Sequence, residues 1–273
     1  METQVIEPHG FCAGVTAALK RALAVSSGGG EVFCLHELVH NEIVVADLAR
    51  RGFRFVDDVA AVPEGATVLF SAHGVAPSVR AAAAGRGLKV IDATCPFVAR
   101  VHRAVSEFAA RGLRVVVIGN PDHVEVKGIV GEVAAAEVVR DLRDAADLPR
   151  RSPGERLGVV SQTTMNSDEV GRIVARLRER FEVETTAEAC HATKERQDAV
   201  RRFSGDALLV LGSVNSSNTR RLCEVAPCRV FRAGTMDEVR ALDLSGVNTL
   251  GLTSGASTPE TFFSEARRFL ERR

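Results

Sequence analysis

The chain has 273 residues, of which 45% are hydrophobic and 26% charged, and its 35 Lys and Arg residues balance 35 Asp and Glu residues. This composition is typical of a globular protein with ample core, and zero formal charge excludes a general attraction to nucleic acid or anionic lipid. No apolar stretch approaches the roughly 20 residues of a membrane span, and the N-terminus has no signal-peptide pattern. We therefore expect a cytoplasmic protein that binds neither nucleic acid nor membrane.

Short apolar runs alternate with amphipathic segments along the chain. Helical spacing of apolar residues, three and four apart, occurs for example at 167–181 and 259–273. The alternation predicts an α/β fold with mostly parallel strands, in which ligands collect beyond the carboxyl ends of the strands. Runs that end in small polar residues, and so mark such ends, lie at 66–74, 113–120, 156–164, 206–217 and 248–258.

Three of the six cysteines stand between a predicted strand and a predicted helix. Cys12, Cys95 and Cys190 share this position, 83 and 95 residues apart. The recurrence predicts three similar α/β lobes, which we place at 13–95, at 96–190, and at 191–273 together with the N-terminal strand 1–12.

A cysteine between a strand and a helix is well placed to ligate a metal. Pro96 fits the first turn of a helix, so the preceding Cys95 is expected at a helix N-terminus, where the thiolate is favoured. Three such thiolates on a central axis predict a metal site, and three unrelated buried cysteines are the alternative. We expect Cys34, Cys223 and Cys228 to be small buried hydrophobic residues.

Three histidines and one glutamate are further candidates for the site. His40, His73 and His123 fall in predicted loops, where functional residues are frequent. Glu125 is expected beside His123 on a short extended segment, where a carboxylate next to an imidazole relays protons. A structural histidine and a solvent-exposed glutamate are the alternatives.

Three loops, at 161–164, 215–221 and 254–260, are rich in hydroxyl groups, and each follows a strand and opens a helix. Together they predict an anion site. Each is also typical of an ordinary helix cap, and Ser257 with Glu260 matches a capping box. The sequence has neither GxxxxGK[ST] nor GxGxxG, which excludes a standard nucleotide loop.

Seven motifs in one order, from residue 9 to about residue 260, resemble the LytB/IspH family of 4-hydroxy-3-methylbut-2-enyl diphosphate reductases. They are HGFCAGV, LVHNEIVV, FSAHGVAPSVR, DATCPFVARVH, SQTT, NSSN and SGASTPE. The resemblance implies three lobes around a central 4Fe–4S cluster with one open iron, which converts to 3Fe–4S on oxidation, and with Cys12, Cys95 and Cys190 as ligands.

The activity implied by the resemblance is reductive dehydroxylation to isopentenyl and dimethylallyl diphosphate, the last step of the non-mevalonate isoprenoid pathway. A ferredoxin or flavodoxin is the implied electron donor. Glu125 matches the family's proton donor, which His123 and Thr163 assist as catalytic residues. The implied substrate ligands are His40, His73, His123, Thr163, Ser216, Ser217, Asn218 and Ser257.

Several flanking positions depart from the family pattern, although every residue assigned to the site is kept. The standard reductase is favoured because changes around a site usually tune it rather than redefine it. A paralogue for another allylic or diphosphate substrate, and a non-catalytic iron–sulfur or zinc redox sensor, are the alternatives. The departures are His9, Thr16, Ala17, Asn120, Val124 and His191.

Overall fold

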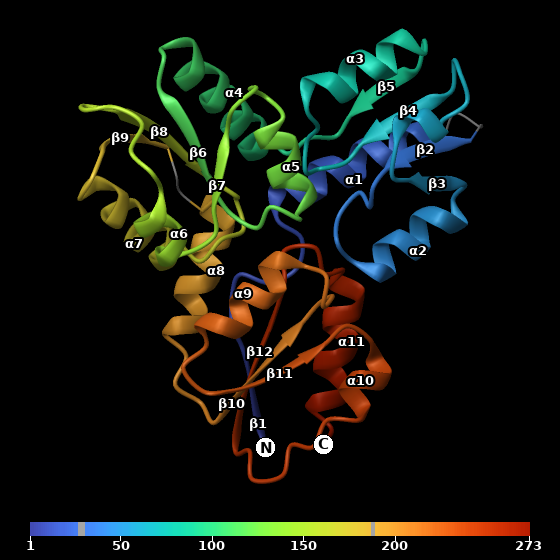
Figure 1. The fold of residues 1–273 in the computed structure, drawn as a ribbon. Coiled ribbons are helices and arrows are strands. Elements are labelled where there is room, and N and C mark those ends of the chain that lie inside the picture. Colours follow the sequence, from blue (N-terminus) through green and yellow to red (C-terminus); the bar gives the residue numbers. More distant parts are fainter. Residues whose placement is uncertain (27–30, 187–188) are drawn as a thin grey trace. The chain divides into compact units, whose positions relative to one another are not determined.

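The computed structural model describes residues 1–26, 31–186 and 189–273. Within these ranges the chain forms three four-stranded sheets, and every strand pairing is parallel (Figure 1). Because parallel neighbours need a crossover connection, helices follow most of the strands. The predicted α/β class is thereby confirmed. No helix in the described ranges combines the length and the apolar character needed to cross a bilayer.

The first sheet joins the two ends of the chain, in the order β1-β12-β10-β11. All five residues of β10 are buried because helices pack on both faces. Leu209 and Leu211 belong to the core under α10 and α11, whereas Leu208 and Val210 belong to the core under α8 and α9. The elements are β1 (Glu2–Val5), β10 (Ala207–Leu211), β11 (Arg229–Ala233), β12 (Thr249–Ser254), α8 (His191–Arg201), α9 (Ser217–Val225), α10 (Met236–Arg240) and α11 (Glu260–Leu270).

The second sheet has the order β3-β2-β4-β5. Phe70 at the end of β4 is fully buried and packs in one core with Ala83 of α3 and Leu88. The elements of this part of the chain are α1 (Ala13–Ser26), β2 (Val32–Leu35), α2 (Glu42–Arg50), β3 (Phe53–Val56), a 3-10 turn (Val59–Ala61), β4 (Thr67–Phe70), α3 (Pro77–Gly85) and β5 (Lys89–Asp92).

The third sheet has the order β7-β6-β8-β9. Alternate residues of β6 serve different cores: Val116 packs with Ile173 of α7, and Val117 packs with Phe108 of α4. At Gly158 of β8, an added β-carbon would lie 2.4 Å from the Phe108 ring, so only glycine fits there. The elements are α4 (Pro96–Ala110), β6 (Arg114–Ile118), α5 (Val124–Val130), β7 (Glu137–Val139), α6 (Leu142–Asp147), β8 (Arg156–Ser161), α7 (Ser167–Arg178) and β9 (Glu182–Thr185).

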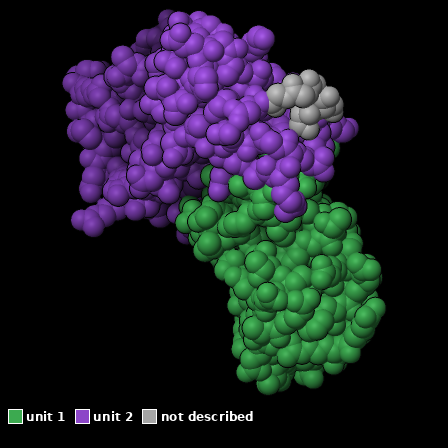
Figure 2. Space-filling view, turned by 90° about the vertical axis from the view of Figure 1, so that its right-hand side faces the viewer, with its two compact units in different colours: residues 1–16, 39–48, 191–273 green, residues 17–38, 49–190 purple. Residues whose placement is uncertain are grey.

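The chain divides into two compact units (Figure 2). Unit 1 comprises residues 1–16, 39–48 and 191–273 and contains the first sheet. Unit 2 comprises residues 17–38 and 49–190 and contains the other two sheets. The lobe boundaries predicted from the cysteine spacing stay a prediction.

Candidate functional site

Cys12, Cys95 and Cys190 each lie immediately before a helix, as predicted. They precede α1, α4 and α8, and the strands before them are β1, β5 and β9. Pro96 is the first residue of α4, so Cys95 is its N-cap residue. All three cysteines are partly exposed. The three thiols therefore share one local environment, at the start of a helix and within reach of a ligand.

The other three cysteines have a different environment. Burial raises the pKa of the Cys34 thiol to about 12 and that of Cys223 to about 11, and it also raises the pKa of Cys228. A thiol must lose its proton before it ligates a metal, so these three residues are poor ligands. The expected burial is confirmed for Cys34 only, since Cys223 and Cys228 are partly exposed.

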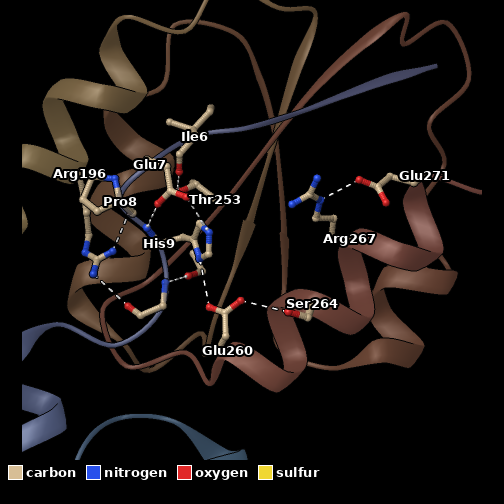
Figure 3. A network of polar contacts seen from close by, with 12 residues as sticks. Ile6, Glu7, Pro8, His9, Arg196, Thr253, Glu260, Ser264, Arg267 and Glu271 are labelled. Carbon is tan, nitrogen blue, oxygen red and sulfur yellow. Dashed lines mark hydrogen bonds and ion pairs between the residues drawn. The ribbon is translucent and has the colours of Figure 1, made fainter.

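The loop that carries Cys12 is held by unit 1 (Figure 3). Arg196 of α8 donates to the carbonyl oxygens of Pro8 and Gly10, at 2.9 Å each. The Val15 N–H donates to Cys12 Sγ at 3.4 Å. A buried guanidinium and a helix N-terminus thus fix the backbone and the thiol of this candidate ligand. The sequence analysis missed Arg196.

His9 is one of the departures from the family pattern, and the structure accommodates it. Its ring stacks on Phe263, with centroids 3.7 Å apart and planes 7° apart. Nε2 lies 3.1 Å from a Glu7 carboxylate oxygen and Nδ1 lies 3.3 Å from one of Glu260 (Figure 3). Gly10 has a φ of 68°, and a β-carbon there would lie 3.1 Å from Glu260. An aromatic ring between two carboxylates thus occupies this position.

The loop that carries Cys95 is held by the end of the neighbouring strand. The Cys95 N–H donates to Ala72 O at 3.0 Å, and Thr94 donates to Asp92 from its N–H, at 2.9 Å, and from its hydroxyl. Burial pushes the pKa of Asp92 upward, but the hydrogen bonds from Thr94 and the contact with Arg80 outweigh it and leave this pKa lowered. Asp92 is therefore an anionic anchor for the turn into α4.

The His73 and His123 rings of unit 2 meet edge to face, with centroids 5.6 Å apart. The Ser71 hydroxyl lies 3.1 Å from His73 Nδ1. His123 is the N-cap residue of α5, and its Nδ1 accepts the Glu125 N–H at 3.2 Å. A ring nitrogen that accepts carries no proton, so the ring proton of His123 lies on Nε2. The expectation of a short extended segment here is wrong, because the imidazole cap starts a helix.

Glu125 is 2% exposed and lies in the first turn of α5. It accepts two hydrogen bonds from Thr163, from the N–H at 2.6 Å and from the hydroxyl at 3.1 Å. The carbonyl of the same Thr163 accepts the Cys190 N–H at 3.0 Å. Thr163 therefore links a buried carboxylate to the backbone of a candidate metal ligand, within one unit.

Hydroxyl and amide groups gather at the start of α9 in unit 1. Ser216 is the N-cap residue, and its hydroxyl accepts the Thr219 N–H at 3.3 Å. Ser217 and Asn218 are the first two residues of the helix, and Asn218 Oδ1 accepts the Ala256 N–H at 2.8 Å. Ser216 is thus a helix cap, in agreement with the alternative left open by the sequence.

Ser257 does not form the capping box that the sequence left open as the alternative. The helix α11 begins at Glu260, its N-cap residue is Pro259, and no side chain caps it. The Ser257 hydroxyl instead donates to the carbonyl oxygen of His40, at 3.0 Å. This contact joins two loops of unit 1 that are 217 residues apart in sequence.

Each unit assembles part of the predicted site. Unit 1 contains Cys12, His40 and the hydroxyl-rich loops at 215–221 and 254–260. Unit 2 contains Cys95, Cys190, the hydroxyl-rich loop at 161–164, His73, His123 and Glu125. Across residues 1–26, 31–186 and 189–273, no group of three or more His, Cys, Asp or Glu side chains has the arrangement of a metal site. The roles assigned to individual residues stay predictions. The thiols at three helix starts nevertheless have the donor chemistry that an iron–sulfur cluster requires.

Parallel sheets that present cysteines, histidines and a buried carboxylate beyond their carboxyl ends are typical of an α/β enzyme. A family model described as LytB protein matches residues 4–271. The chain belongs to this family. Membership implies an iron–sulfur cluster as cofactor.

Individual relatives agree with this family. A 4-hydroxy-3-methylbut-2-enyl diphosphate reductase of Pseudomonas fluorescens is 43% identical, over 95% of this chain and 87% of the relative. A protein of the same name from Leifsonia xyli is 42% identical, over 94% and 80%. The solved structure of the E-1-hydroxy-2-methyl-but-2-enyl-4-diphosphate reductase from Plasmodium falciparum matches with a TM-score of 0.93 and 32% identity, over 98% of this chain and 87% of that one.

Proposed function

We propose that the chain is a 4-hydroxy-3-methylbut-2-enyl diphosphate reductase, which removes the allylic hydroxyl to form isopentenyl and dimethylallyl diphosphate, the last step of the non-mevalonate isoprenoid pathway. The observation that carries the proposal is the buried Glu125 carboxylate, which Thr163 holds by its N–H and its hydroxyl. The names of the relatives support the choice of substrate.

The proposed cofactor is one 4Fe–4S cluster with Cys12, Cys95 and Cys190 as ligands. Three protein ligands leave one iron open, and loss of that iron in air gives a 3Fe–4S form. When bound, the cluster supplies two electrons, one at a time, and a Lewis-acidic iron. A ferredoxin or flavodoxin is the proposed donor, because the side chains of this protein offer no source of electrons. A cytoplasmic location belongs to the same proposal.

Removal of the hydroxyl as water consumes two electrons and two protons, and Glu125 is the proposed source of the proton that leaves with the oxygen. The Thr163 hydroxyl donates to Glu125 Oε2 and thereby keeps the carboxyl in one orientation. His123 has its ring proton on Nε2, because Nδ1 accepts from the backbone. His123 can therefore donate from Nε2 to a phosphate oxygen, while Glu125, two residues further along the chain, donates the proton to the leaving hydroxyl.

Hydroxyl, amide and imidazole donors are the proposed ligands of the diphosphate. Hydroxyl, amide and imidazole groups follow the carboxyl ends of the strands, and the N-terminus of α9 adds backbone N–H groups that favour an anion. The proposed ligands are His40, His73, His123, Thr163, Ser216, Ser217, Asn218 and Ser257.

The test is turnover of 4-hydroxy-3-methylbut-2-enyl diphosphate by protein reconstituted without oxygen and supplied with an artificial reductant. We expect both isoprenyl diphosphates as products. Glu125→Gln should keep the visible absorption of the cluster and lose about 100-fold or more of the turnover. Glu107→Gln, at an exposed position of α4, is the matched control and should retain both the absorption of the cluster and the turnover.

Other outcomes would point to other functions. Cluster-loaded protein that forms neither product would contradict the proposal and favour a paralogue with another substrate, to be sought with a panel of allylic diphosphates. A colourless zinc protein, or full activity in Glu125→Gln, would contradict the cofactor or the proton donor respectively. Because the chain has no Trp and no Tyr, a bound cluster would dominate the near-ultraviolet absorption as well.

A further inference from the structure

A second histidine–glutamate pair lies in unit 2, apart from the residues assigned to the site. His102 of α4 is 8% exposed, and its Nδ1 lies 2.6 Å from Glu132 Oε1. Since a carboxylate oxygen accepts, Nδ1 is the donor. The Ser106 hydroxyl donates to the other oxygen of Glu132 at 3.3 Å. Both oxygens of the carboxylate are thus engaged, and the imidazole ring has one orientation.

The opposite edge of the His102 ring faces backbone. A β-carbon added at Gly74, where φ is 74°, would lie 2.8 Å from His102 Nε2. A β-carbon added at Gly128 would lie 3.3 Å from Gly74 O and 3.4 Å from His102 Cε1. The ring is therefore wedged between the 71–76 loop and α5, and neither glycine leaves space for a side chain.

These two neighbours carry residues of the proposed site. Gly74 directly follows His73, and Gly128 lies on α5, which His123 caps and whose first turn holds Glu125. The rings of His73 and His123 touch edge to face. The helices α4 and α5 pack against each other (Figure 1). The His102 ring therefore lies between the two segments that carry His73 and His123.

We propose that His102, oriented by Glu132, is a positioning residue that sets the spacing between His73 and His123 and thereby the affinity for the diphosphate group. His102 Nε2 faces the backbone of Gly74, and the proposed role is one of position rather than of proton transfer. The inference rests on the proposed function for the identity of the ligand. It predicts an effect on binding rather than on the chemical step.

The experiment compares His102→Leu, which keeps bulk but has no donor, with His102→Asn, whose amide nitrogen replaces Nδ1. The loss of a hydrogen bond to a charged group corresponds to about 10- to 100-fold. We expect His102→Leu to raise KM for the diphosphate substrate about 10-fold or more, with kcat within about 3-fold, because uniform binding is lost. His102→Asn should restore KM to within about 3-fold of the wild type.

Glu132→Gln is the second variant, because it keeps the shape and one acceptor oxygen of the native residue and is expected to fold if His102→Leu does not. It should raise KM in the same direction, and the double variant should be no worse than His102→Leu, since both remove one interaction. Glu107→Gln on α4 is the control and should leave KM unchanged. The absorption of the cluster should be the same in all variants.

Binding of inorganic diphosphate, measured by calorimetry, separates this inference from the proposed function. Wild-type protein that neither binds diphosphate nor turns over the substrate contradicts the proposed function. Wild-type activity with unchanged KM in both His102→Leu and Glu132→Gln overturns the positioning role alone. A fall in thermal stability with unchanged KM also overturns it, because His102 would then be a structural residue only.

Discussion

Arg196→Met tests how the loop that carries Cys12 is held. The Arg196 residue is 3% exposed and donates to the carbonyl oxygens of Pro8 and Gly10, at 2.9 Å each. Hydrogen bonds from charged groups contribute about 1.5–3 kcal/mol each, so the two together are worth about 3–6 kcal/mol. Burying a guanidinium costs part of this gain, and methionine fills much of the volume. We expect a net loss of about 2–4 kcal/mol in the free energy of unfolding.

The assay is thermal unfolding of the cluster-free protein. For a chain of this size, 1 kcal/mol shifts Tm by about 2–4 °C, so Arg196→Met should lower Tm by about 4–16 °C. Arg267→Met is the matched control in the same unit (Figure 3). Arg267 donates to Glu271 at 2.7 Å, with side chains 51% and 44% exposed. Such an exposed pair contributes about 0.5 kcal/mol, and the control should shift Tm by less than about 2 °C.

Iron content after reconstitution gives a second readout, because an unanchored loop no longer presents the Cys12 thiol in one place. Arg196→Lys keeps the charge but not the planar fork that reaches two carbonyls, and it should restore less than half of the lost Tm. A Tm for Arg196→Met equal to that of the Arg267→Met control would refute the reasoning. The loop would then be held by its other contacts.

Three further predictions concern unit 2. Thr163→Val should lower turnover about 10- to 100-fold by removing the hydroxyl that orients Glu125, whereas Thr163→Ser should retain most of the turnover. Equal turnover in the two variants would contradict the orienting role of the hydroxyl. The lowered pKa of Asp92 means that its stabilisation is present at neutral pH and is lost progressively as pH falls below about 4. Asp92→Asn should therefore destabilise the protein at pH 7 in urea unfolding, and its difference from the wild type should shrink as pH falls below about 4; a difference that does not change with pH would contradict the role. With a pKa of about 12, Cys34 should resist iodoacetamide at pH 8 in the folded cluster-free protein and react with it in urea. Peptide mass spectrometry measures the labelling, and equal labelling in the folded and unfolded protein would contradict the burial of this thiol.

The fold class could be predicted because strands and helices have local signals in the sequence. The run that becomes β10 is apolar at every position, since both faces of the strand are buried. The segment that becomes α7 places Val170, Ile173, Val174 and Leu177 at spacings of three and four, and all four are buried. Both signals depend on neighbours in sequence and are therefore visible without the structure.

The errors arose where a side chain finds a distant or unusual partner. Ser257 with Glu260 has the spacing of a capping box, but the hydroxyl donates to His40 instead. His123 caps α5 with an imidazole nitrogen, a partner outside the usual set of Ser, Thr, Asp and Asn. Arg196 gave one signal only: it falls on the buried face of α8 beside Gln197 and Val200. An arginine there needs acceptors, and the sequence does not say which.

Strand order is the information that the sequence lacks. β6 and β8 are neighbours in register, with Ile118 opposite Ser161, although β7 lies between them in the chain. Their carboxyl ends are therefore adjacent, and the segments that follow bring Glu125 within hydrogen-bond distance of Thr163. The local pattern selected Glu125 beside His123 and, separately, the loop at 161–164, but only the resemblance joined Glu125 to Thr163, because 38 residues separate them. Once the order of the strands is known, their meeting follows from the geometry of a parallel sheet.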